Sequence, residues 1–179
     1  MKVFAYCTES ARRAVRAATG TEPLTSPPIN SGRFDPLALE GHDLLYFRLH
    51  GKPASAAWYG DDDIVALLPF QLWPVDLGGA VAIVANCYGA QSPMVRALYD
   101  AGARAVIGGS GENLAAAQKV IGTDLLVQWV IRMMRLGANV RRALKVARLR
   151  LWLTGWRASD RDAARFSLLG GDGNYEEVT

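Results

Sequence analysis

Cys87 and His50 are the residues of this 179-residue chain whose chemistry points most directly to catalysis. A cysteine attacks a carbonyl carbon as its thiolate, and a nearby histidine takes up the thiol proton and later gives it to a leaving amine. The chain holds one further cysteine, Cys7, and one further histidine, His42. Because His42 precedes an apolar run that His50 follows, we expect it at the opposite end of a strand. Cys87 and His50 therefore form the candidate dyad.

Each dyad residue follows a short apolar run. Residues 44–49 (LLYFRL) end at His50, and residues 79–85 (GAVAIVA) end at Asn86 and Cys87. Such runs indicate parallel strands that are buried on both faces, and catalytic groups gather beyond the carboxyl ends of these strands. If the strands are neighbours, about 4.8 Å apart, their loops bring an imidazole near a thiol. The structural alternative is a buried cysteine and a histidine that merely ends a strand.

The rest of the chain alternates predicted strands and helices. This pattern indicates an α/β fold, a three-layer sandwich around a mainly parallel sheet. We expect one domain over 1–179, in which 123–165 is a helical C-terminal portion. Further strands are predicted over 3–7 and 104–109, helices over 11–18, 64–73 and 93–102, and a loop over 20–40 with a short edge strand near Leu24.

Gly51 directly follows the candidate base. A glycine at this position allows the backbone to approach a neighbouring loop closely. Its N–H, together with that of Cys87, would form an oxyanion hole for the tetrahedral intermediate.

Several segments in this order resemble the caspase-like cysteine peptidases, which include caspases, gingipains, clostripain, separase and CHAT domains. They are YFRLHG, VAIVANCYGAQ with the helix that follows it, and AGARAVIGGSGEN. The similarity covers roughly residues 43–115 and is greatest to the bacterial gingipain-like and CHAT branches. The resemblance implies caspase-like, flavodoxin-like winding with the His strand beside the Cys strand. It also implies that Cys87 is the nucleophile, His50 the general base or proton donor, and Gly51 a backbone contributor to the oxyanion hole.

Residues beyond the dyad bear on substrate choice. Ser110 and Glu112 lie in the loop over 110–113, which follows the predicted strand over 104–109 and should border the same rim as Cys87. Glu112 would then pair with an Arg or Lys before the scissile bond. The alternative is that Ser110 or Asn113 caps a helix and that Glu112 is solvated. Asp61–Asp63 follow the His50 loop and are interpreted as a solvated turn. The alternative is that they pair with a charged group of the substrate or bind a cation.

Composition narrows the range of functions. With 50% hydrophobic and 21% charged residues, the chain matches an ordinary folded domain. It shows neither a secretory signal pattern nor an apolar run of about 20 residues, so we expect a cytoplasmic protein without a membrane partner. No Cys/His cluster and no phosphate-binding GxxxxGK[ST] or early GxGxxG motif is present, so neither metal nor cofactor is predicted.

Positive charge is concentrated near the C-terminus. Residues 132–165 hold ten Lys or Arg against two Asp. The predicted helix over 138–152 is amphipathic with a basic surface, which we interpret first as a solvated face. Contact with nucleic acid, a membrane or an acidic partner is the alternative, although nucleic acid is not expected as a partner.

These patterns together predict a cysteine endopeptidase that acts on protein or peptide substrates through a thioacyl-enzyme intermediate, with cleavage after a basic residue as one option. One alternative is a catalytically inactive caspase-like interaction module whose basic segment over 138–165 binds a regulatory protein. A second alternative is a flavodoxin-like domain that binds a nucleotide or phosphate.

Overall fold

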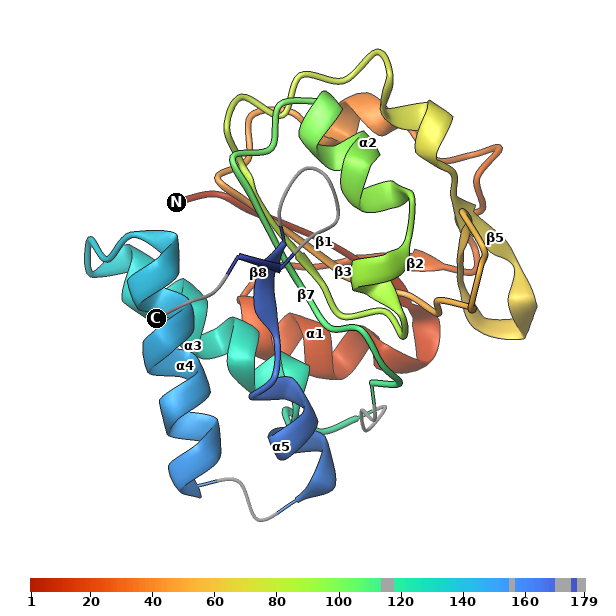
Figure 1. Cartoon of the computed structure of the whole chain (residues 1–179). Helices are drawn as coiled ribbons and strands as arrows, with labels where there is room; N and C mark the ends of the chain where they lie inside the picture. The colour runs from red at the N-terminus through yellow and green to blue at the C-terminus, as the bar shows by residue number, and fades with distance from the viewer. Residues whose placement is uncertain (114–117, 155–156, 170–174, 177–179) are drawn as a thin grey trace.

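The computed structural model describes residues 1–113, 118–154, 157–169 and 175–176 (Figure 1). Its seven-stranded sheet is formed by β1 (Val3–Thr8), β2 (Leu24–Ser26), β3 (Leu44–Arg48), β6 (Val81–Val84), β7 (Ala105–Gly108), β8 (Ser167–Leu169) and β9 (Tyr175–Glu176). The order is β2-β1-β3-β6-β7-β8-β9. Pairing is parallel from β2 to β7 and antiparallel from β7 to β9. The expected α/β fold with a mainly parallel sheet is confirmed, and so is the strand near Leu24.

Helices cover both faces of this sheet (Figure 1). They are α1 (Arg12–Thr19), α2 (Met94–Asp100), α3 (Thr123–Arg135), α4 (Val140–Thr154) and α5 (Ala158–Ala163). Side chains alternate along β3, so that Leu44 and Tyr46 join one core while Leu45 and Phe47 join the other. The first core packs against α1, α3, α4 and α5, and the second packs against α2. Two cores on opposite faces of one sheet make the three-layer arrangement.

Short elements connect these layers. A two-stranded antiparallel sheet pairs β4 (Trp58–Tyr59) with β5 (Val65–Leu67). The 3-10 helices are η1 (Glu9–Ala11), η2 (Pro36–Leu39), η3 (Asp61–Asp63), η4 (Pro69–Leu72) and η5 (Gly89–Gln91).

The helix predicted over 64–73 is wrong, because β5 and η4 occupy this segment. Pro69 explains the difference. A proline disfavours helical backbone in the residue before it, and Leu68 is extended, with φ −124° and ψ 145°. The apolar run is therefore divided into a strand and a single helical turn.

The helices of the described part of the chain include none that is both long and apolar enough to span a membrane.

For the site, the pairing of β3 with β6 matters most. Their register ends with Phe47 opposite Val84, so the loops that carry His50 and Cys87 leave the sheet side by side. The adjacency that the resemblance implied for these two strands is present.

Candidate functional site

Asn86 ties the two loops together just beyond the sheet. The ladder continues past the strands, because Ala85 N–H donates to Phe47 O at 2.8 Å. The fully buried Asn86 then accepts a hydrogen bond from Leu49 N–H on its Oδ1, also at 2.8 Å. Leu49 precedes His50 and Asn86 precedes Cys87. One side chain therefore fixes the position of both dyad residues.

Gly51 makes the closest approach between the loops. A Cβ placed on Gly51 would lie 1.9 Å from Cys87 O and 3.1 Å from Cys87 C. Real Cβ atoms do not approach backbone atoms this closely, so any other residue would push the loops apart. This contact is the physical reason for a glycine directly after His50.

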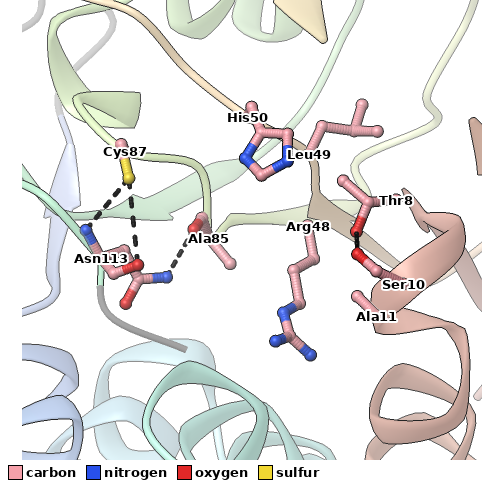
Figure 2. Close-up of a pocket in the computed structure, with 9 residues that line it drawn as sticks. All are labelled: Thr8, Ser10, Ala11, Arg48, Leu49, His50, Ala85, Cys87 and Asn113. Atoms are coloured by element: carbon pink, nitrogen blue, oxygen red, sulfur yellow. Dashed lines mark hydrogen bonds between the residues drawn. The ribbon is translucent and has the colours of Figure 1, made fainter. Parts of the chain in front are cut away.

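A small cavity of about 130 Å³ opens between the loops. His50 and Cys87 both face it (Figure 2). The His50 side chain is 55% exposed, and Cys87 is half-buried. The cavity is lined by Thr8, Ser10, Ala11, Arg48, Leu49, His50, Ala85, Cys87 and Asn113.

Asn113 holds the thiol of Cys87. Its N–H donates to Cys87 Sγ at 3.2 Å, and its carbonyl oxygen lies 3.9 Å from the same sulfur. The Asn113 side chain is fixed in turn, since Thr123 Oγ1 donates to its Oδ1 at 2.8 Å and its Nδ2 donates to Ala85 O. The loop over 110–113 does border Cys87, as expected, but the sequence suggested Asn113 only as a helix cap and did not predict its contact with the thiol.

His50 is held through both its backbone and its ring. Its N–H donates to Tyr59 O at 2.7 Å, and its carbonyl accepts from Tyr59 N–H at 2.9 Å. Its Nε2 lies 3.6 Å from Asp61 Oδ1. In Figure 2 one ring nitrogen is on the Cys87 side and the other is on the Ser10 side. The ring thus lies between a thiol and a carboxylate.

Asp61 is anchored by Ser10, which lines the cavity. Ser10 N–H donates to Asp61 Oδ2 at 2.8 Å, and Ser10 Oγ donates to Asp61 Oδ1 at 2.9 Å. Asp62 and Asp63 are exposed, as expected for a solvated turn. Asp61 departs from that interpretation, because it is only 25% exposed and faces His50. A base oriented by a third group is the arrangement that nucleophilic enzymes use.

Cys87 and His50 share the cavity without touching. No hydrogen bond joins their side chains within the part of the chain that the structure describes, because the sulfur is directed at Asn113. Catalytic hydrogen bonds are often long in an unliganded site and tighten when substrate is bound.

Two backbone N–H groups near the Cys87 thiol have no hydrogen-bond acceptor in the described residues. In the described residues, neither Gly51 N–H nor Cys87 N–H donates a hydrogen bond. The following residue, Tyr88, has left-handed backbone with φ 55°. Bonds from Tyr88 N–H to Gly111 O at 2.9 Å and from Ala90 N–H to Gly109 O at 3.0 Å hold this turn. Strained backbone at a reactive residue persists only where its surroundings fix it.

Ser110 and Glu112 lie outside this cavity. They line a second hollow of about 130 Å³ together with Asp162 and Arg165. Glu112 Oε1 accepts a hydrogen bond from Tyr88 OH at 3.4 Å, and the phenol pKa of Tyr88 is raised by desolvation and by this carboxylate. Glu112 is thus linked to the turn after the nucleophile but does not line the Cys87 cavity.

A buried ion pair lies beneath the site. Arg48 Nη1 is 2.5 Å from Asp124 Oδ2, and Tyr46 OH donates to Asp124 Oδ1 at 2.8 Å. Burial raises the pKa of the Asp124 carboxyl to about 6, against the opposing effect of Arg48. Sequence reasoning missed this pair. The available signal was the charge of Arg48 inside an apolar strand, since charged residues are rarely buried without a partner.

No group of three or more His, Cys, Asp or Glu side chains in the described residues is arranged to hold a metal ion.

Comparison of the chain with protein-family models gives no match, and comparison with curated proteins gives none either.

Proposed function

We propose that this protein is a cysteine endopeptidase, with Cys87 as the nucleophile and His50 as the general acid and base. One observation carries the proposal. The two side chains leave adjacent parallel strands and line a single cavity, and in the described residues the backbone N–H groups of Gly51 and Cys87, on the same two loops, donate no hydrogen bond. The resemblance to caspase-like peptidases supports the same assignment.

Acylation begins when the substrate carbonyl carbon approaches Cys87 Sγ. His50 takes up the thiol proton, and the sulfur forms a bond to the carbonyl carbon. The oxygen gains negative charge, which the N–H groups of Gly51 and Cys87 are placed to stabilise. Collapse of the tetrahedral intermediate breaks the C–N bond, and His50 donates its proton to the leaving amine.

Deacylation repeats these steps with water. His50 accepts a proton as water attacks the thioacyl carbon, and the C–S bond breaks to release a carboxylic acid. The proton then returns from His50 to the Cys87 sulfur. Asp61 supports both halves, because a carboxylate 3.6 Å from Nε2 orients the ring and stabilises the imidazolium that forms in each.

A panel of peptidyl acyloxymethyl ketones tests the proposal. The peptides carry Arg, Lys, Asp or Asn next to the reactive group, so that the panel also tests the preference for a basic residue that Glu112 suggested. We expect an adduct on Cys87, located by mass spectrometry, that is lost in His50→Ala and retained in Cys7→Ala.

An unmodified Cys87 across the whole panel would overturn the peptidase assignment if iodoacetamide still alkylates it. Accessible but unreactive sulfur of this kind is what the catalytically inactive interaction module predicts.

A further inference from the structure

The outer side of α4 exposes apolar side chains that the fold does not use. The helix packs against α3 through Ala143, Leu144, Ala147 and Leu151, which are fully buried. On its opposite side Leu149 is 54% exposed, Trp152 69% and Leu153 59%. A spacing of three and four residues places these three on one side of the helix. Figure 1 shows α4 at the edge of the molecule.

Positive charge accompanies this apolar surface. The sequence of α4 contains five Lys or Arg residues and no acidic residue. Arg142 and Lys145 are exposed and lie about two turns and one turn, respectively, before Leu149 on the same side. Arg148 is partly engaged, since its Nε donates to Ala164 O at 2.8 Å. The outer side of α4 is therefore cationic in its first half and apolar in its second half.

A hollow joins the two halves. Its volume is about 330 Å³, and it is lined by Lys145, Arg148, Leu149, Trp152 and Ala164. Two cationic side chains therefore line the same hollow as an indole and a leucine. A ligand that fits has negative charge and an apolar portion in the same molecule, which describes an anionic phospholipid.

We propose that the outer side of α4 docks on an anionic lipid surface. Lys145 and Trp152 are seven residues apart, which is about 10 Å along a helix. Interfacial helices bury their apolar face by about 5–10 Å while their cations remain among the headgroups. With α4 inclined to the bilayer so that its second half lies deeper, Trp152 and Leu153 enter the acyl boundary while Lys145 and Arg142 are level with the phosphates. This contact lies on the bilayer surface and departs from our expectation of no membrane partner.

Nucleic acid and protein fit the same surface less well. A phosphate backbone would pair with the cations but would leave Trp152 and Leu153 in water. A second copy of this chain would bring cationic helices together, which is unfavourable because like charges repel. An anionic bilayer satisfies the charge and the apolar side chains together.

Vesicle co-sedimentation of the full chain tests the proposal. The vesicles are pure phosphatidylcholine, or phosphatidylcholine with 30 mol% phosphatidylglycerol. We expect binding only to the anionic vesicles, at least tenfold weaker in 0.5 M NaCl. Trp152→Ser should weaken it at least tenfold, and so should Lys145→Glu.

Two variants provide matched controls. Trp73→Ser removes another exposed indole, which is 81% exposed beside η4. Arg33→Glu makes the same change in net charge as Lys145→Glu at an exposed position on another element. Both should bind anionic vesicles as the unmodified protein does.

Several results would overturn the proposal: no binding to anionic vesicles, equal binding to both vesicle types, or equal loss in the variants and their controls. Gel filtration gives one more result that would overturn the proposal. It is a protein that does not bind vesicles but self-associates, with the self-association abolished in Trp152→Ser. None of these results depends on peptidase activity.

Discussion

The two cysteines lie close to the carboxyl ends of two parallel strands, yet their surroundings are opposite. Cys7 lies inside β1, opposite Arg48 in register, and is fully buried. Burial raises the pKa of its thiol to about 12. Cys87 lies three residues beyond β6, where it lines a cavity with His50. Position near a strand end is therefore not enough to open a thiol to a cavity, and the cysteine also has to lie beyond the sheet.

Replacing each cysteine in turn should give the largest contrast. Cys87→Ala is expected to lower kcat/KM at least about 10³-fold, because the nucleophile is lost. Cys7→Ala should retain activity within about twofold, since its thiol does not line the cavity. Initial rates on the peptide that the probe panel selects would measure both. Equal losses of kcat/KM in the two variants would contradict the assignment of Cys87 as the nucleophile.

Gly51→Ala tests whether the contact between the loops maintains the geometry around Cys87. The added methyl group would lie 1.9 Å from Cys87 O. We expect kcat to fall about 10²-fold as the oxyanion donors shift, while the protein remains folded by circular dichroism. Gly32→Ala is the control, because its Cβ would meet only Asn30 Oδ1, at an ordinary 3.5 Å. Unchanged kcat in Gly51→Ala would show that the loops separate freely.

The buried layer beside Cys7 should respond to pH. Burial raises the pKa of Asp124 to about 6, so the folded protein keeps a proton that the unfolded chain releases near pH 4. The free energy of unfolding should therefore fall by about 2 kcal/mol from pH 4 to pH 6.5. Urea titrations measure this change. Subtracting the change measured in Asp124→Asn removes the contribution of other carboxyl groups. If the free energy of unfolding then showed no fall, the predicted direction would be contradicted.

Asp61→Asn should have the smallest effect of the four. The amide keeps the size of the side chain but removes the negative charge 3.6 Å from His50 Nε2. We expect kcat to fall about tenfold, because the imidazolium loses its counter-charge. Asp62→Asn is the control, since Asp62 is exposed and adjacent in sequence. A similar loss in both variants would indicate a general effect of charge rather than support of His50.

Apolar runs predicted the sheet well, because a strand buried on both faces leaves a continuous signal. The placement of His50 and Cys87 in one cavity followed from the ends of two such runs. The error at 64–73 came from giving Pro69 too little weight within an apolar segment. Proline divides such a segment even where the hydrophobic pattern continues.

The residues that support the dyad were not predictable in this way. Asp61 depends on Ser10, which is 51 residues earlier in the chain. Asn113 reaches Cys87 across 26 residues, and Arg48 finds Asp124 across 76. Each pairing exists only after the sheet has assembled, and a local pattern of residue types contains no information about it.

The contact of Gly51 with Cys87 also determines how the site can respond to a ligand. Because backbone meets backbone there, no change of rotamer alters the separation of the two loops. A substrate that needed a wider gap would have to break the hydrogen bond from Leu49 to Asn86 as well. The two loops are thus held at a fixed separation, which under the proposed peptidase function would limit the thickness of the chain that can lie between them.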